Sequence, residues 1–216
     1  MRKKNARSLA SWIVILIFAV FWLLVTFVPF LFMVITGFKQ KIETIMYGAF
    51  HMPSKFFPDN YMSIITDPQF WTYFRNSVIV LVLSLVILLF ISACAAYPLS
   101  RFHFKMRASV YALIVAAMSV PMHVTLIPVF QMTVNTGLYD TIWALVPTNV
   151  AFATPISVFI LTGFMKGIPM ELEEAADIDG CGRYARFFKV ILPLAKPGLS
   201  TLAIYNGVNN SSSLSP

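Results

Sequence analysis

The side chains that could do chemistry gather in one late stretch of the chain, EEAADIDGCGRYARFFKVILPLAKP, residues 173–197. Ten charged residues, five acidic and five basic, lie between Lys166 and Lys196. The chain shows no nucleophile–base pair, no paired carboxylates inside an apolar segment and no metal-ligand spacing. Its two cysteines, Cys94 and Cys181, lie in separate segments and are expected to be unpaired. The sequence therefore predicts no enzyme and neither a metal nor a cofactor, and the charged stretch is expected to make an interaction.

This stretch is predicted to form two short helices joined at a glycine corner. Pro169 stands where a first helical turn tolerates proline, and the glutamates after it lie near the positive end of the helix dipole. Gly180 is expected to end the first helix in the left-handed conformation, and the second helix begins at Arg183. An apolar stripe at helical spacing follows, made of Tyr184, Phe187, Phe188 and Ile191. Such a pair can dock a partner or rest among lipid headgroups, and both alternatives stay open.

The composition indicates that the surrounding elements lie in a membrane. Hydrophobic residues make up 58% of the 216 residues and charged residues only 12%, with a mean hydropathy of +0.77. Soluble domains average about 25% charged residues. The net charge of +7 would suit a nucleic acid, but the basic residues cluster at the ends of apolar runs. That placement is typical of membrane orientation, so no nucleic-acid partner is expected.

Four runs without Asp, Glu, Lys or Arg are each long enough to cross a hydrocarbon core of about 30 Å as a helix. The first is too long for a signal peptide and has no small-x-small cleavage site after it. We predict spans at residues 12–36, 77–98, 109–131 and 142–165. The fold class is therefore all-α, a polytopic membrane helix bundle with four complete spans and the start of a fifth.

The distribution of lysine and arginine predicts the orientation of these spans. If the spans alternate, twelve of the sixteen basic residues fall on one side, which the positive-inside rule makes cytoplasmic. The N-terminus and the charged stretch then both lie inside. Residues 39–75, which contain three prolines, are expected outside with an extended or turn-rich structure, either as a linker or as a docking surface for an external partner.

Prolines and polar residues inside the third and fourth runs suggest helices around a pathway. Proline in a membrane helix frees a carbonyl that a neighbour or a wet cavity must satisfy. The candidate pathway-lining residues are Pro121, His123, Thr148, Asn149 and Pro155. The alternative is that these polar groups only join helices by hydrogen bonds. No charged residue lies within the four spans, which weighs against ion-coupled transport.

The charged stretch resembles the EAA loop of the integral-membrane subunits of ABC importers. That pattern has E-A-A, then D-G four residues after the first alanine, then I-x-L-P. The matching residues are Glu174, Ala175, Ala176, Asp179, Gly180, Val190, Leu192 and Pro193. NSVIV, AAYPLSRFHFK, IPVF and GIPMELEEAADIDG further resemble the carbohydrate branch, which contains the smaller membrane subunit of the maltose permease. The resemblance covers about residues 10–208 and implies the type I importer permease fold.

The resemblance also implies a function and partners. The first loop helix would be a coupling helix that seats on a separate ATP-binding subunit, with Glu174 pairing with a basic residue of that subunit. Two ATP-binding subunits, a second homologous permease subunit and an external solute-binding protein would complete the complex in a bacterial or archaeal plasma membrane. The chain contains no G-x-x-x-x-G-K-[ST] loop, so ATP hydrolysis is expected on the partner. An importer of another solute and a non-transporting membrane scaffold are the alternatives.

The predicted organisation has three parts. Residues 1–38 hold the cytoplasmic N-terminus and the first span, residues 39–75 the external segment, and residues 76–216 the transmembrane core with the EAA coupling loop at 166–197. Members of the family continue with two further spans, whereas SSSLSP follows here. We expect a truncation or frameshift after about residue 208, with a naturally short member as the alternative.

Overall fold

The computed structural model describes residues 4–48 and 51–213, with side chains described for 11–48 and 51–209. The basic residues Arg2 and Lys3 and the last residues of the tail, 214–216, lie outside this part. Every regular element in the described part of the chain is helical, which confirms the predicted all-α fold class. The chain divides after Thr72 into two compact units, which are described separately.

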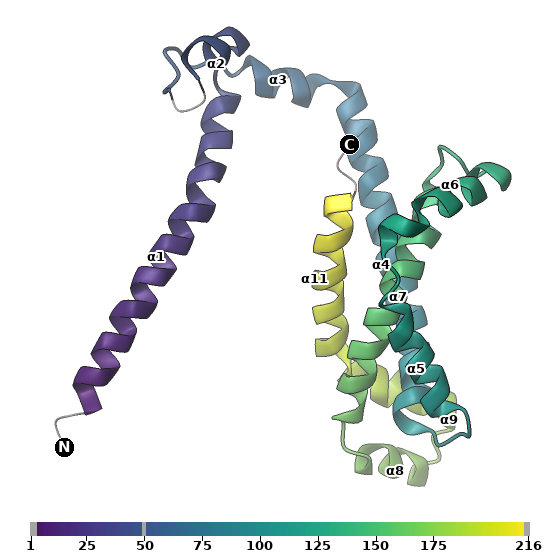
Figure 1. Ribbon diagram of the computed structural model, residues 1–216. Helices are drawn as coiled ribbons and strands as arrows, with labels where there is room; N and C mark the ends of the chain where they lie inside the picture. The colour runs from purple at the N-terminus through teal and green to yellow at the C-terminus, as the bar shows by residue number, and fades with distance from the viewer. Residues whose placement is uncertain (1–3, 49–50, 214–216) are drawn as a thin grey trace. The chain divides into compact units, whose positions relative to one another are not determined.

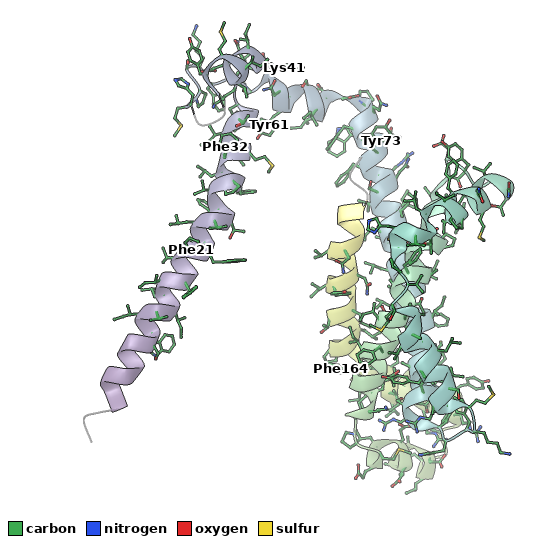
Figure 2. All side chains as sticks on the ribbon, in the orientation of Figure 1. Phe21, Phe32, Lys41, Tyr61, Tyr73 and Phe164 are labelled. Atoms are coloured by element: carbon green, nitrogen blue, oxygen red, sulfur yellow. The ribbon has the colours of Figure 1, made fainter. Side chains whose placement is uncertain are left out.

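The first unit begins with the long helix α1, Lys4–Gly37. Its segment Ser11–Gly37 is long and apolar enough to cross a membrane, in agreement with the predicted span 12–36. Large apolar side chains project from it in all directions, Phe21 among them, and Trp12 and Trp22 are 68% and 70% exposed (Figure 2). A helix that is apolar all round is suited to lipid.

After α1 the chain folds back into two short helices, α2 (Lys41–Tyr47) and α3 (Asp59–Thr66). The prediction of extended or turn-rich structure for residues 39–75 was therefore wrong for much of that segment. The reason is local packing that spacing does not reveal, because the rings of Phe38 and Phe56 stack with centroids 4.5 Å apart. The Asn60 amide also donates hydrogen bonds to the carbonyls of Gly37 and Lys39, at 3.0 and 2.7 Å.

The second unit contains the remaining helices, apart from the first turn of α4, which belongs to the first unit (Figure 1). Two long ones, α4 (Pro68–Arg101) and α7 (Ile142–Lys166), can each cross a membrane. The shorter elements are α5 (Arg107–Ala117), η1 (Met122–Thr125), α6 (Leu126–Asn135), α8 (Glu171–Ile178), α9 (Arg183–Arg186), the π-helical turn η2 (Phe187–Ile191), α10 (Leu192–Leu194) and α11 (Lys196–Ser213). Helices α5 and α11 both pack against α7.

The third predicted span, 109–131, is not one straight helix. The chain bends by 85° between α5 and the segment Met122–Asn135. Pro121 lies at this break with an extended backbone, φ −67° and ψ 127°, where it cannot donate a hydrogen bond to the preceding turn. By contrast, Pro147 and Pro155 lie inside the continuous helix α7. The number of crossings therefore depends on whether each bent pair counts as one span.

Side chains of α4, α7, η2 and α11 share the buried core of this unit. It combines alanines of α4 and Ala195, which precedes α11, with larger apolar groups of α7, η2 and α11: Ala93, Ala96, Leu161, Met165, Ile191, Ala195 and Leu202. One polar contact joins α11 to α7, because the buried Asn206 amide donates to the Ser157 hydroxyl at 3.2 Å. At the start of α11, Gly198 lies directly against the Phe164 ring, labelled in Figure 2. Small residues at helix contacts are typical of membrane bundles.

Candidate coupling site and transmembrane cavity

The EAA stretch forms the predicted helix pair at one end of the second unit, beyond the last turns of α4 and α7 (Figure 1). Helix α8 begins after Met170 and carries three glutamates in its first turn, where they complement the helix dipole. It ends at Ile178 with Asp179 as its C-cap; Gly180 follows with a left-handed φ of +78°, and the Cys181 amide donates to the Ala176 carbonyl at 2.9 Å. The corner is therefore a helix end closed by a left-handed glycine after the C-cap, as expected from the sequence.

The second helical run differs from the prediction in one respect. It passes from α9 through a π-helical turn at Phe187–Ile191, and the extra residue in that turn rotates the side chains that follow. Phe187 and Ile191 are buried at 6% and 0% exposure, whereas Tyr184 is 84% exposed and Phe188 is 49% exposed. The predicted continuous apolar stripe is thus split between the core and the surface.

A buried ion pair attaches α8 to the end of α4. The Nε atom of Arg101 lies 2.6 Å from Oε1 of Glu173, and the two side chains are only 6% and 4% exposed. The two atoms do not meet in hydrogen-bond geometry, so the attraction between them is chiefly that of opposite charges. The second carboxylate oxygen of Glu173 accepts a hydrogen bond from the Tyr97 hydroxyl at 3.1 Å. Both oxygens of this buried carboxylate therefore face groups of α4.

Arg101 also holds the segment that leads into α8. One of its terminal nitrogens donates to the Ile168 carbonyl at 2.7 Å, and the other lies 3.8 Å from the Met170 sulfur. The Tyr97 ring packs against Phe187, with centroids 5.1 Å apart, so the polar contacts lie beside an aromatic cluster. These contacts fix α8 relative to α4 through side chains from both helices and from the loop between α7 and α8.

Most of the predicted EAA residues are exposed, and they lie mainly on α8 and the glycine corner. Glu174, Ala175, Asp179, Gly180 and Pro193 are exposed, Leu192 is half-buried, and Ala176 packs inside at 8% exposure. Two large side chains next to the corner are almost fully exposed, Ile178 at 87% and Tyr184 at 84%. A charged helix that presents bare apolar groups is a surface suited to docking.

Sequence reasoning missed the anchoring residues Tyr97, Arg101 and Glu173. Arg101 does carry a signal, since it is the first charged residue after a run of 25 uncharged ones, residues 76–100. Among the glutamates of α8, however, nothing in the sequence separates the buried Glu173 from the exposed Glu174. An ion pair from Arg186 to Asp177, at 3.2 Å, also links the two helical parts of the EAA loop, and the Arg107 side chain donates to the Leu99 carbonyl at 3.0 Å at the end of α4.

The structure separates the five candidate pathway residues. Thr148 lines a cavity of about 780 Å³ formed by α4, η1, α6 and α7. Asn149 is buried at 9% exposure and Pro155 is half-buried, both elsewhere in α7. Pro121 and His123 are exposed at the bend before α6. Of the five, only Thr148 belongs to the lining of this cavity.

Residues 88–212, more than half of the chain, match the protein family described as the binding-protein-dependent transport system inner membrane component. The chain belongs to this family. The matched region includes the ion pair and the whole EAA loop. The predicted resemblance to an ABC importer permease subunit is thereby confirmed, and the family is one of transporter membrane components.

Individual relatives point to the carbohydrate branch. The chain is 44% identical over 88% of its length to an ABC transporter permease protein of Caldicellulosiruptor sp. (strain Rt8B.4), of which it covers 69%. It is 37% identical over 87% of its length to the diacetylchitobiose uptake system permease protein of Streptomyces coelicolor, covering 62% of that protein. It is 32% identical over 96% of its length to the arabinooligosaccharides transport system permease protein of Halalkalibacterium halodurans, covering 75%.

A solved structure shares the fold. The crystal structure of a bacterial ABC transporter involved in the import of the acidic polysaccharide alginate contains a chain that matches 97% of this one, with a TM-score of 0.78 and 22% identity. The match extends over 72% of that chain. The family and its apolar helices make this a multi-pass membrane protein of the ABC permease kind, and the carbohydrate branch is the one that its relatives support.

Proposed function

We propose that this chain forms part of the translocation pathway of an ATP-driven oligosaccharide importer and that α8 is its coupling helix. The observation that carries the proposal is that α8 and its corner expose side chains on one surface while a buried ion pair attaches α8 to α4. Ile178, Tyr184 and Glu174 face outward, while Glu173 is held against Arg101 of α4. A helix anchored in this way can pass a push from a docked partner to the membrane helices.

The partner that fits this face is a separate ATP-binding subunit with an apolar cleft and a basic residue opposite Glu174. Two copies of that subunit, a second permease subunit and an external solute-binding protein complete the proposed complex. The names of the relatives in Streptomyces and Halalkalibacterium favour oligosaccharides as the solute. If the spans alternate, twelve of the sixteen lysine and arginine residues fall on the side of the EAA loop and the N-terminus, which favours a cytoplasmic position for both.

A charge reversal on the docking face tests the proposal. Glu174→Lys is expected to weaken copurification with the ATP-binding subunit of the proposed complex, because it places a like charge against the partner's basic residue. Glu171→Lys is the matched control, since Glu171 is also exposed in the first turn of α8 but lies outside the E-A-A motif. Membrane insertion should be unchanged in both variants.

The outcomes separate the alternatives. If copurification is lost only with Glu174→Lys, the result supports α8 as the coupling helix. If copurification is lost equally with both variants, the result indicates general charge repulsion instead. If the unchanged chain copurifies with no ATP-binding subunit, the importer proposal fails and a membrane scaffold becomes the better explanation. Binding of saccharides by the neighbouring external binding protein then separates sugar import from import of another solute.

A further inference from the structure

The cavity of about 780 Å³ lies at the end of the second unit away from α8. Asn76 of its lining precedes Arg101 by 25 residues along the continuous helix α4, which is about 38 Å at ~1.5 Å per residue. That separation exceeds the ~30 Å thickness of a hydrocarbon core. The Asn76 end of the cavity and the coupling helix are therefore far enough apart to lie at opposite faces of a membrane, and in the proposed orientation that end faces the side from which an importer receives its solute.

Aromatic rings form part of the cavity wall. Tyr73 stands near the start of α4 and is 61% exposed, and Tyr139 precedes α7 and is 60% exposed (Figure 2 labels Tyr73). The ring of Tyr139 meets that of Phe130 edge to face, with centroids 5.6 Å apart. Rings with an apolar face and a polar edge offer both the packing and the hydrogen bonding that a sugar ring needs.

Polar groups of three elements accompany the rings. The Asn76 amide can donate and accept, and the Asp140 carboxylate can accept from hydroxyl groups. The Thr148 hydroxyl donates to the Ala144 carbonyl of its own helix at 2.8 Å, which leaves its oxygen free to accept. A mainly apolar cavity of several hundred Å³ with a few polar groups is the usual form of a small-molecule site.

The backbone at Asp140 is unusual in a way that supports a site. Its φ is +60°, and among the described residues other than glycine it alone has a positive φ. The turn before it is held by the amides of Leu138 and Tyr139, which both donate to the Thr133 carbonyl at 2.9 and 3.1 Å. Such conformations persist where the surroundings fix them, and they gather at binding sites.

The charge of the lining indicates the class of saccharide. It contains one carboxylate, Asp140, and no lysine, arginine or histidine. A carboxylate without a cation beside it repels a uronate but accepts hydrogen bonds from neutral hydroxyl and acetamido groups. We propose that this cavity is a subsite for neutral saccharides and that it rejects acidic ones. The inference rests on the proposed function, because it takes the transported solute to be an oligosaccharide.

Cysteine protection tests the subsite in the full chain, reconstituted in lipid nanodiscs. In a background with Cys94→Ser and Cys181→Ala, Thr148→Cys reports on the cavity. Thr136→Cys is the matched control: the Thr136 hydroxyl also donates to its own helix, at the end of α6, but it does not line the cavity. The reagent is a hydrophilic maleimide, and the probes are maltotriose, xylotriose, triacetylchitotriose and trigalacturonate, each titrated to its solubility limit.

At a saccharide concentration about ten times the dissociation constant, labelling of the Thr148→Cys variant should slow roughly tenfold with at least one neutral probe. Trigalacturonate should not protect this variant, and labelling of the Thr136→Cys variant should not change with any probe. Adding Asp140→Asn to Thr148→Cys should let trigalacturonate protect, and adding Tyr139→Ala should abolish protection by the neutral probe.

Three results would overturn the inference: no protection by any neutral probe, equal protection by the acidic probe, or labelling only by a membrane-permeant apolar maleimide, which would mean that lipid fills the cavity. Copurification of the same preparation with the ATP-binding subunit is measured in parallel. If that binding is normal while no saccharide protects, the subsite fails and the proposed coupling function stands.

Discussion

Removing the charge of Glu173 should detach α8 from α4 while leaving the docking face chemically intact. Glu173→Gln keeps the shape of the side chain but leaves Arg101 as a buried charge with its chief counter-charge gone. The exposed Glu174→Gln is the matched control, because it makes the same chemical change at the adjacent position of the same helix. The two variants therefore separate anchoring from docking.

The burial of the Arg101–Glu173 ion pair determines how much free energy its loss should cost. Both side chains are at least nine-tenths buried, at 6% and 4% exposure, so this is not a surface salt bridge. Removing one member of a buried pair costs about 3–5 kcal/mol, because the other charge remains uncompensated. At 1.4 kcal/mol per tenfold, the open form of α8 should become roughly 100-fold or more populated. Tyr97→Phe removes only one hydrogen bond to the carboxylate and should cost about 1.5–3 kcal/mol.

Amide hydrogen exchange measured on the chain in nanodiscs reports this opening directly. The amides of α8 that bond within the helix should lose their protection in Glu173→Gln, show a smaller loss in Tyr97→Phe and remain unchanged in Glu174→Gln. Replacing both partners, as in Arg101→Met with Glu173→Met, should restore much of the protection, because no buried charge is then left unpaired.

The reasoning would be refuted by a loss of protection in Glu173→Gln of less than about fivefold, which corresponds to only about 1 kcal/mol. An equal loss in Glu173→Gln and Glu174→Gln would also refute it, since the effect would then follow from helix charge rather than from the ion pair. A double variant whose loss of stability equals the sum of the losses in Arg101→Met and Glu173→Met alone would show that the contact has no pairwise component.

Three further predictions concern other parts of the chain. Gly180→Ala should destabilise the α8 corner by about 1–2 kcal/mol; the cost comes from the left-handed backbone alone, because the added Cβ meets open space. Gly182→Ala should not destabilise the corner, because the φ of Gly182 is −63°. Hydrogen exchange of the Cys181 amide measures the effect of each variant. Gly198→Ala places a Cβ 2.8 Å from Cγ of Phe164 and should lower the free energy of unfolding by about 1–3 kcal/mol. Gly207→Ala is the control in the same helix, because its Cβ makes only ordinary contact, and it should be neutral or stabilising. Detergent unfolding followed by circular dichroism measures both variants. Hydrogen bonds from the Ser54 side chain and amide lower the pKa of Glu43 below its ordinary value of 4.5. The stability that these bonds add is therefore fully present above pH 4.5 and is lost as the pH falls through the lower pKa of the folded state. Carboxyl NMR titration should show that the pKa of Glu43 rises in Ser54→Ala and stays unchanged in the control Ser63→Ala.

Much of the helical framework could be predicted from the absence of charge. The uncharged runs correspond to α1, α4 and α7 because a membrane helix must satisfy its backbone internally and tolerates few charges. The same reasoning does not give the path of the chain at a proline. Pro121 accompanies an 85° break whereas Pro155 lies inside a continuous helix, and only the packing of neighbouring helices distinguishes the two outcomes.

The EAA loop shows where sequence reasoning reaches its limit at the site. Spacing predicts α8, its acidic first turn and its glycine stop, since all three depend on residues that are close in the chain. The ion pair joins residues 72 positions apart, 101 and 173, and forms only when α8 packs on the end of α4. The π-helical turn has the same origin, since it places Phe187 beside Tyr97 in the core.

Helix α4 connects the two sites described above, which makes it the element through which they can affect each other. Tyr73 and Asn76 of the cavity lie near its start, and Tyr97 and Arg101 of the ion pair lie at its end. A continuous helix fixed at one end can transmit displacement without a chain of separate contacts. Detaching α8 by Glu173→Gln should therefore leave saccharide protection of the Thr148→Cys thiol intact but make it insensitive to ATP on the partner subunit. If protection in Glu173→Gln still responded to ATP as in the unchanged complex, the signal would have to pass through α7 or α11 instead.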